Sequence, residues 1–583
     1  MTIVWAFQVM NFKKLLIDTI RKSPKWDSRL LLARLYFWNI RYSNRKFGDG
    51  RLPADLDRIK KTYHSSKKPK RVLIATGTGG HKTAIEMELL LGLSLQARGA
   101  EVISLLCDEA LPACQLCEPR IFPDAASFTK HGPRSLCNIC FRPAKEKYLD
   151  IGINARQYSQ YLRKEDVDLA KELSITIPIG KIECFKVDSV AVGEHAKAGT
   201  LRFFARGTIS GDQASNEVYR RYFEAALLTH YAIRNLIEQE DIDIAVFHHG
   251  IYVPQGVIGE TLRSKNVRVV NWNVAYRRNC FIFSHDDTYH HTLMSESTHH
   301  WDDMEWSNEH EQLIDDYLVS RRFGARDWIH FVGDPVLDKQ RILERLGCDK
   351  DKPMVLCLSN VVWDAQLHYP QNAFENMIEW VLDTIKYFAT RPDLQLVIRI
   401  HPAEIRGAVP TKQPLESEIR EYFKELPDNV FIVPPDSNIS SYVLAELCDS
   451  AIIYGTKMGV ELTAMSIPVI VAGEAWIRNK GLTCDVMTKD EYHGILGKLP
   501  FEQRLADEKT TKAKKYAYHF FFRRMIPVEC FTIGSEFQPY YFEGSVTDIL
   551  PGKDPGLDTI CQGILEGTPF IYTSLQERRI ARL

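Results

Sequence analysis

The chain has 583 residues, 45% of them hydrophobic, and its 74 Lys and Arg residues nearly balance its 75 Asp and Glu residues, giving a formal net charge of −1. This length suits more than one core, since single cores rarely grow beyond about 250–300 residues. The near-neutral charge excludes a global attraction to nucleic acid, so we expect no nucleic-acid partner and expect any bound anion to be held locally.

Three further features of the sequence point to a cytoplasmic protein. The sequence holds no run of about 18 apolar residues, so we expect no membrane-spanning helix. The apolar start meets Lys13 and Lys14 only after its apolar run, which is the reverse of a secretory signal. Thirteen cysteines, an odd number, favour a reducing compartment over a disulfide framework.

Residues 1–66 are predicted to form a helical segment. LLIDTIRK and RLLLARLYFWNIRY carry apolar residues at helical spacing, with Lys and Arg between them. A basic helix with aromatic residues suits peripheral contact with an anionic membrane surface on the cytoplasmic side. We favour the alternative, a helix that packs on its own domain.

Residues 67–330 are predicted to form a first parallel-sheet domain. The strand RVLIA, a glycine-rich loop, a helix that ends near Arg98 and the strand EVISLL make a βαβ unit. DIDIAVFHHG, VPQGVIGETLRSKN and VRVVNWN continue the alternation as strand, helix and strand. A Cys-rich insertion interrupts this domain at about 107–186.

A second series of strands and helices occupies residues 331–500. PMVLCLSN, LQLVIRIHP, NVFIVPP, SAIIYG and IPVIVAG read as strands, with helical patterns between them. Residues 501–583 form a mixed tail, largely helical, that we expect to pack back on the first domain. The predicted fold class is α/β, with two Rossmann-like parallel-sheet domains facing a cleft, and we expect the ligand at the carboxyl ends of the strands.

The stretch YGTKMGVELTAMSIPVIVAG, residues 454–473, predicts an anion site. Gly455 and Gly459 allow a close backbone approach, Thr456 and Lys457 add a hydroxyl and a cation, and the following helix start presents unpaired N–H groups. Glu461 can accept hydrogen bonds from ribose hydroxyls. The alternative is that the glycines only permit a tight turn and that Glu461 caps the helix dipole.

His401 and Pro402 predict a second donor site, because they follow the strand LQLVIRI at its carboxyl end. The proline keeps the histidine extended, so that the imidazole points toward the ligand and can donate to a phosphate oxygen. Arg399 lies on the same face of that strand. The alternative is a histidine with a purely structural role.

A glycine-rich loop, residues 76–82, follows the first strand and lets a ligand or the opposite domain come close. Its spacing departs from GxGxxG, and no acidic residue closes the second strand, so we expect no NAD. An acceptor sugar or a diphosphate is the expected ligand. The residues expected at this acceptor site or domain interface are Gly77, Thr78, Gly79, Gly80, His81, His248 and His249.

Two CxxC pairs predict a structural metal site in the insertion. Cys114, Cys117, Cys137 and Cys140 have nearly the spacing of a tetrahedral zinc site, and the segment between them has little periodicity. Cys107 and Cys184 lie nearby in the sequence, so an iron–sulfur cluster stays open as a second choice after zinc. The alternative is a set of ordinary thiols, and we expect no catalytic metal.

A glycosyl transfer that inverts the anomeric centre requires a general base, and we look for it near the ends of the strands. Asp108 and Glu109 follow EVISLLC directly, and we rank them narrowly first, with His401 as the other expected catalytic residue. The remaining candidates are His248, His249, Asp286, Asp287 and Glu260.

These motifs resemble those of a known group. GTGGH is similar to the glycine loop of GT-B glycosyltransferases. LSNVVWDAQ, RIHPAE and the run from AELCD to IRNKG resemble bacterial capsule and surface-polysaccharide biosynthesis proteins, including relatives of the capsule Kdo transferases. The likeness covers most of residues 70–490 and is strongest across 352–482.

The resemblance implies a transferase that moves a sugar from a nucleotide-activated donor to a polysaccharide or lipid-linked glycan. In that family the His-Pro pair lies at the donor phosphate, and the turn before the Glu-bearing helix holds the nucleotide. Contact with the inner membrane or a polysaccharide assembly complex would follow. Because Gly-Thr-Lys replaces a serine-rich turn, CMP-, UDP- and GDP-linked donors stay open. The alternatives are a CDP-polyol phosphotransferase, a sugar-nucleotide 2-epimerase and a non-catalytic assembly scaffold.

Overall fold

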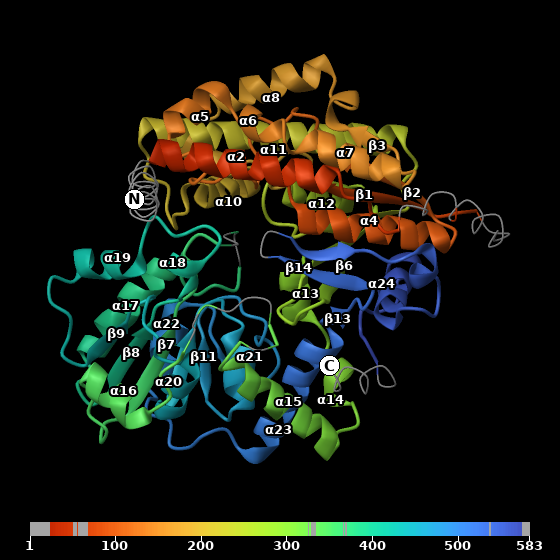
Figure 1. Ribbon diagram of the computed structural model, residues 1–583. Helices are drawn as coiled ribbons and strands as arrows, with labels where there is room; N and C mark the ends of the chain where they lie inside the picture. Colours follow the sequence, from red (N-terminus) through yellow and green to blue (C-terminus); the bar gives the residue numbers. More distant parts are fainter. Residues whose placement is uncertain are drawn as a thin grey trace, which may run out of the picture. The chain divides into compact units, whose positions relative to one another are not determined.

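The computed structural model describes residues 24–49, 55, 68–324, 326–327, 331, 334–364, 367, 370–535 and 538–573. The chain packs into two compact units, and Figure 1 labels most of their elements. Of the described residues, unit 1 takes in those up to 204, those in 209–267 and those in 532–550. Unit 2 takes in the described residues in 205–208, in 268–531 and from 551 on.

The units divide the chain differently from the predicted domains. Residues 268–330 pack with the second half of the chain, so the predicted limit at 330 falls inside unit 2. Of the predicted tail, residues 532–550 belong to unit 1 and the rest belongs to unit 2. Of the two predicted N-terminal helices, LLIDTIRK lies outside the described residues, and the other is present as α2, Pro24–Ser43.

Unit 1 is built on four parallel strands in the order β4-β1-β2-β3. The bounds are Arg71–Gly77 for β1, Glu101–Leu106 for β2, Ala155–Gln157 for β3 and Ile244–His248 for β4. The predicted strand–helix–strand unit is present, with α4, Lys82–Ala97, between β1 and β2. α4 is buried along its whole length, which is why its sequence is apolar on nearly every side.

Short helices and one long helix complete unit 1. α11 has 27 residues and contacts α5, α8, α10 and α12. β14, Phe531–Ser535, and β15, Gln538–Phe542, form a two-stranded sheet, and β15 contacts α4. The helices are α5 Ala125–His131, α6 Arg134–Cys137, α7 Phe141–Asp150, α8 Lys164–Thr176, α9 Ile179–Ile182, α10 Val192–Phe204, α11 Gln213–Gln239 and α12 Gln255–Ser264, with 3-10 turns at Tyr158–Gln160 and Val546–Ile549.

Unit 2 contains a six-stranded parallel sheet in the order β12-β11-β10-β7-β8-β9. When the strands are numbered from β7 and read from the β9 edge, the order is 3-2-1-4-5-6, which is the doubly wound order of a Rossmann fold. The bounds are Met354–Leu358 for β7, Gln395–Arg399 for β8, Val430–Val433 for β9, Ser450–Ile453 for β10, Val469–Val471 for β11 and Cys484–Asp485 for β12. The strands predicted between residues 352 and 473 are all confirmed.

Three further strands of unit 2 pair antiparallel, in the order β5-β6-β13. Their bounds are Arg268–Val274, Cys280–His285 and Ile526–Pro527. The predicted α/β fold with Rossmann-like parallel sheets is confirmed, and these three strands add antiparallel pairing that was not predicted from the sequence. VRVVNWN is followed by a short turn rather than a crossover helix, and a short connection can join only antiparallel neighbours.

Helices cover the sheet of unit 2. In the described residues the core gathers around Trp380, Phe388, Ile398 and Ile452, all at most 1% exposed. The helices are α13 Tyr289–Ser295, α14 His299–Asp302, α15 Asn308–Arg321, α16 Lys339–Leu346, α17 Met377–Ala389, α18 Ala403–Arg406, α19 Leu415–Tyr422, α20 Ser441–Leu447, α21 Met458–Ala464, α22 Lys489–Leu496, α23 Asp507–Tyr518 and α24 Pro555–Glu566, with a π-helical turn at His519–Arg523.

Candidate functional site

A pocket of about 410 Å³ opens at the carboxyl ends of the parallel strands of unit 2. Ser359 and Asn360 follow β7, His401 follows β8, residues 454–457 follow β10, and Glu474 follows β11; all of them line the pocket. β7 and β10 are neighbours, and the strands that follow each of them in the chain are added toward opposite edges of the sheet. Ligands of doubly wound sheets bind at such a switch point, and the volume lies in the usual range for small-molecule sites.

His401 presents a neutral N–H donor to this pocket. Its Nδ1 accepts the Ala403 N–H at 3.1 Å, and its own backbone N–H donates to Ser359 Oγ at 3.0 Å. With Nδ1 as acceptor, the neutral ring carries its proton on Nε2. Burial, with smaller contributions from Lys457 and Arg399, lowers the pKa of His401 to about 4. At pH 7 the ring is therefore a donor without a charge.

Lys457 lies at the pocket wall and belongs to a buried ion-pair network. Its Nζ donates to Glu461 Oε1 at 2.8 Å and lies 4.9 Å from the centre of the Tyr276 ring. Arg321 Nε donates to Glu461 Oε2 at 2.9 Å, and the Arg321 guanidinium also pairs with Asp327. Two cations and two carboxylates thus neutralise one another, and all of them except Glu461 also line the pocket.

Glu461 does not have the surroundings that the ribose prediction requires. Its side chain is 0% exposed, and it accepts hydrogen bonds from Lys457, Arg321 and the Tyr442 hydroxyl. Although burial alone would raise the pKa of Glu461, Arg321 and Lys457 lower it to about 2. The carboxylate is saturated by these donors and is not among the residues that line the pocket, so we correct its role to that of a structural anion.

The two glycines of the turn differ in role. Gly455 lines the pocket, where a Cβ atom would lie 3.3 Å from Asn360 Nδ2. At Gly459 a Cβ atom would lie 2.6 Å from Ile453 Cδ1 and 2.7 Å from Ile477 Cγ2. Gly459 therefore lets α21 pack against the sheet, and the prediction that it binds the donor is not supported.

Arg399 supplies a buried positive charge behind His401. It is 1% exposed, and its guanidinium donates to the carbonyl oxygens of Ile400, Pro434 and Ser437. Within the described chain no carboxylate lies within hydrogen-bonding distance of it, although Asp436 attracts it from further away. Burial lowers the pKa of Arg399 to about 10, which leaves it charged at pH 7. An anion in the pocket would feel this charge.

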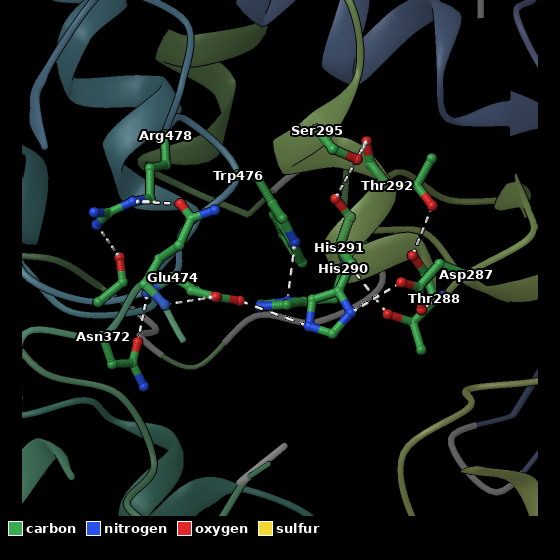
Figure 2. Close-up of polar contacts among 12 residues, drawn as sticks. Asp287, Thr288, His290, His291, Thr292, Ser295, Asn372, Glu474, Trp476 and Arg478 are labelled. Atoms are coloured by element: carbon green, nitrogen blue, oxygen red, sulfur yellow. Dashed lines mark hydrogen bonds and ion pairs between the residues drawn. The ribbon is translucent and has the colours of Figure 1, made fainter. Parts of the chain in front are cut away.

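Figure 2 shows a second group of polar residues in unit 2, some of which line the same pocket. His291 lies between two carboxylates: Nδ1 is 3.3 Å from Asp287 Oδ2, and Nε2 is 3.6 Å from Glu474 Oε2. The Trp476 indole N–H donates to His290 Nδ1 at 3.1 Å. Glu474, His290 and Trp476 line the pocket, so a carboxylate backed by a histidine faces the ligand space.

Three aromatic rings make another part of the wall. Tyr276 and Tyr289 lie 5.9 and 6.0 Å from Trp476, measured between ring centres, and all three line the pocket. Aromatic faces next to a few convergent polar groups are typical of small-molecule sites and suit a nucleobase or sugar ring. None of these rings was predicted from the sequence: Tyr276 and Tyr289 lie far from the motif at 454–473, and Trp476 lies just beyond its end.

Glu474 and the pair Ser359 and Asn360 were also missed. The signal was present, since each follows a predicted strand directly: VIVAG precedes Glu474, and MVLCL precedes Ser359. The prediction that residues at the carboxyl ends converge applies to them as much as to His401.

The structure brings the predicted acceptor residues of unit 1 together. The His248 backbone N–H donates to Thr76 Oγ1 at 3.0 Å, and the His81 and His248 rings lie 4.7 Å apart. Burial, followed by the charge of Arg202, lowers the pKa of His81 to about 4. Gly77–His81, His248 and His249 thus meet at the carboxyl ends of β1 and β4, and their role toward an acceptor stays a prediction.

Asp108 and Glu109 lie at the end of β2 in unit 1. The Asp108 carboxylate accepts the Ser159 N–H at 3.1 Å and also bonds the Ser159 hydroxyl. Glu109 has a positive φ of 71° and lines a groove of unit 1 with Lys130, Arg134 and other residues. Their assignment as the general base stays a prediction.

The predicted zinc site is not supported. In the parts of the chain that the structure describes, no three His, Cys, Asp or Glu side chains are arranged to hold a single metal ion. Cys114, Cys117, Cys137 and Cys140 all lie in that part, and each is a free thiol. None of the helices in the described residues is long and apolar enough to cross a membrane.

Comparison with known proteins finds a family match for part of unit 2. No curated protein sequence matches the chain. Among solved structures, the β-Kdo 2,4-transferase of KpsC from Thermosulfurimonas dismutans is similar with 12% identity and a TM-score of 0.33, covering 53% of this chain and 87% of that one. The corresponding 2,7-transferase of KpsC gives 12% identity, a TM-score of 0.30, and 55% and 88% coverage.

A UDP-GlcNAc 2-epimerase from Neisseria meningitidis, solved with bound UDP-GlcNAc, is similar with 10% identity and a TM-score of 0.21, covering 77% of this chain and 97% of that one. TM-scores this low do not establish a common fold, so the fold assignment rests on the strand order itself. The sequence profile of the family "capsule polysaccharide biosynthesis protein" matches residues 321–513. This match confirms the resemblance to capsule biosynthesis proteins for the segment that carries Arg321, His401, Lys457 and Glu474.

Proposed function

We propose that the protein is a glycosyltransferase that moves a sugar from a nucleotide-activated donor to a surface or capsular glycan. One observation carries the proposal: a pocket at the switch point of a Rossmann-ordered sheet combines neutral and positively charged donors with an aromatic wall. Phosphate oxygens suit His401, Lys457 and Thr456, and a nucleobase or sugar ring suits Tyr276, Tyr289 and Trp476. The family match over residues 321–513 supports the same chemistry.

In the proposed reaction the acceptor hydroxyl attacks the anomeric carbon of the donor sugar. The bond from that carbon to the phosphate oxygen breaks, and the electron pair leaves on the nucleotide. Fixed donors aimed at the leaving phosphate lower the barrier, because negative charge develops there. The Nε2–H of His401 and the ammonium of Lys457 take this part. α21 has only seven residues, so these side chains, rather than the helix end, carry the proposal.

For transfer with inversion we propose Glu474 as the acceptor of the hydroxyl proton. The carboxylate lines the pocket, and its Oε1 accepts the Gln371 N–H at 3.2 Å, which fixes its orientation. His291 lies next to this carboxylate and Asp287 lies next to His291 (Figure 2), and we assign both a positioning role. This proposal competes with Asp108 and Glu109 of unit 1.

Replacing Glu474 by glutamine should lower the transfer rate by about 10²–10⁴-fold, the usual contribution of a positioned base. Nucleotide affinity should stay within about threefold, because the amide keeps the shape of the carboxylate and can still accept from the Gln371 N–H. The matched variant Glu109→Gln should keep full activity. If Glu109→Gln loses the activity and Glu474→Gln keeps it, the base belongs to unit 1 and our assignment is wrong.

The nucleotide is the first quantity to measure. A thermal-shift screen of the whole chain against CMP, CDP, UDP and GDP should show a raised midpoint with one of them, because a ligand that binds only the folded state adds about 2.7 kcal/mol at a hundredfold excess over Kd. The corresponding nucleosides serve as controls and should shift the midpoint much less. No shift with any of the four nucleotides would reject the donor site and favour the scaffold reading.

Product analysis then separates the enzymes that share this pocket. A glycosyltransferase releases nucleotide only when an acceptor glycan is present. An epimerase converts a nucleotide sugar without any acceptor, and a polyol phosphotransferase requires a CDP-polyol and leaves CMP. Donor release that depends on the acceptor is the result that we expect.

A further inference from the structure

Four thiols of unit 1 surround one small, enclosed cavity. Cys107 follows β2, Cys114 lies in the next loop, Cys137 ends α6, and Cys140 immediately precedes α7. The rest of the lining is mostly apolar: Thr78, Leu111, Leu116, Pro133 and Leu136. Four sulfur atoms gathered from separate segments around an apolar cavity are typical of a metal centre rather than of ordinary core packing.

This set differs from the two CxxC pairs of the sequence. Cys107 lines the cavity, whereas Cys117 does not. The Cys117 side chain is fully buried and interacts with the Tyr222 hydroxyl and with Cys114 instead. The hydroxyl of Tyr222 also donates to the Cys114 carbonyl oxygen at 3.1 Å, which fixes this corner of the loop.

The arrangement of the four thiols suits a metal cluster rather than a single metal ion. Tetrahedral zinc has Zn–S bonds of about 2.3 Å, which places its sulfur ligands roughly 3.8 Å apart. Among the residues whose placement is described, no three ligands are so arranged. In a cluster of four irons and four sulfides each cysteine binds a different iron, so the thiolates lie further apart around a common centre.

Backbone N–H groups face the sulfur atoms of three of the four cysteines. Glu109 and Leu111 donate toward Cys107, Leu116 and Cys117 toward Cys114, and Gly79 and Gly80 toward Cys140. The buried ammonium of Lys82 adds an attractive charge near Cys140. Hydrogen bonds and positive charge at the sulfurs stabilise the anionic form of iron–sulfur clusters and tune their potentials.

The glycine loop packs against this group of thiols. A Cβ atom at Gly79 would lie 2.5 Å from the Cys140 carbonyl oxygen. A Cβ atom at Gly80 would lie 2.5 Å from Leu116 Cδ1 and 3.4 Å from Cys140 Sγ. The close approach that these glycines permit is therefore to the wall of the thiol cavity, which gives the loop a role independent of any sugar.

We propose that Cys107, Cys114, Cys137 and Cys140 hold a four-iron, four-sulfur cluster in unit 1. Cys137 also lines the larger groove that contains Lys130, His131 and Arg134, so one edge of the cluster faces solvent. Solvent access makes such clusters sensitive to oxygen, and the protein must be purified without air. The proposal does not depend on the donor pocket of unit 2.

The test is the metal and sulfide content of the full-length protein, produced with added iron and purified anaerobically. We expect about four irons and four acid-labile sulfides per chain, with a visible absorption band that bleaches on reduction and a paramagnetic signal from the reduced cluster. One zinc per chain without sulfide, or no bound metal at all, overturns the proposal.

Single substitutions identify the ligands. Cys107→Ala and Cys137→Ala should lose most of the iron, whereas Cys117→Ala and the exposed Cys184→Ala should keep it. A two-CxxC site predicts the reverse for Cys107 and Cys117. Far-UV circular dichroism and the thermal unfolding of the full chain serve as the folding control, and iron loss counts only where both match those of the unsubstituted protein. If Cys107→Ala keeps the iron while Cys117→Ala loses it, the ligand set proposed here is wrong.

Discussion

Replacing His401 by alanine should weaken nucleotide binding by about 10- to 100-fold and lower turnover by about 10²–10³-fold. The first figure corresponds to one lost hydrogen bond to a charged phosphate, worth about 1.5–3 kcal/mol, and the second to one lost donor at a developing negative charge. His401 contributes a neutral Nε2–H, because Nδ1 already accepts the Ala403 N–H at 3.1 Å. Titration calorimetry with the nucleotide from the thermal-shift screen measures the affinity.

Two further variants make this result specific. His401→Gln keeps an N–H donor at a similar reach and should recover part of the affinity. His493→Ala removes another histidine of unit 2, which pairs with Asp383 at 2.6 Å outside the pocket, and should change neither affinity nor turnover. Unchanged affinity in His401→Ala would show that the histidine is structural, which is the alternative that the sequence leaves open.

Arg321→Ala should destabilise unit 2 by about 3–5 kcal/mol. Removing one partner of a buried ion pair leaves the other charge unpaired, and the side chains of Arg321, Asp327 and Glu461 are only 5%, 6% and 0% exposed. Urea unfolding followed by tryptophan fluorescence reports on this unit, since the buried Trp272, Trp301 and Trp380 all belong to it.

The adjacent residue provides the matched control. Arg322 pairs with Glu446 through side chains that are 28% and 25% exposed, so Arg322→Ala should cost about 1 kcal/mol or less. Glu461→Ala should behave like Arg321→Ala. If Glu461→Ala instead kept its stability and lost nucleotide affinity, the ribose role predicted from the sequence would be right and the structural role assigned here would be wrong.

The sequence predicted the sheet of unit 2 well because its strands are short buried runs bounded by Gly, Pro and Asn. PMVLCLSN, LQLVIRIHP and SAIIYG each became a strand, and strands buried on both faces read as continuous apolar runs. The antiparallel strand β6 and the 27-residue helix α11 were not predicted. β6 follows β5 after a short turn without the Asn-Gly signal of a tight hairpin.

Pocket residues that belong to a local sequence motif were predicted, whereas those that tertiary packing brings to the pocket were missed. His401, Gly455, Thr456 and Lys457 line the pocket as expected. Glu461 and Gly459 fit the expected motif by residue type and position. However, Arg321, which lies 140 residues earlier in the sequence, neutralises Glu461, and Ile477 packs against Gly459. Long-range partners of this kind leave no signal in a local sequence pattern.

The same limit applies to the cysteines. The CxxC spacing included three of the four thiols that line the cavity, but spacing alone could not show that Cys107 lines it and that Cys117 does not. Which thiols share a cavity depends on how the loop between β2 and α5 packs against β1 and α11. Only the tertiary structure contains that information.

We infer that unit 2 holds a nucleotide where the strand ends of its sheet converge. Hydrogen–deuterium exchange of the full chain, with and without the nucleotide that raises its melting midpoint, tests this directly. We predict slower exchange in peptides that contain residues 359–360, 401–403 and 455–457. Protection confined to unit 1, for example to residues 76–82, or protection in neither unit, would contradict the account.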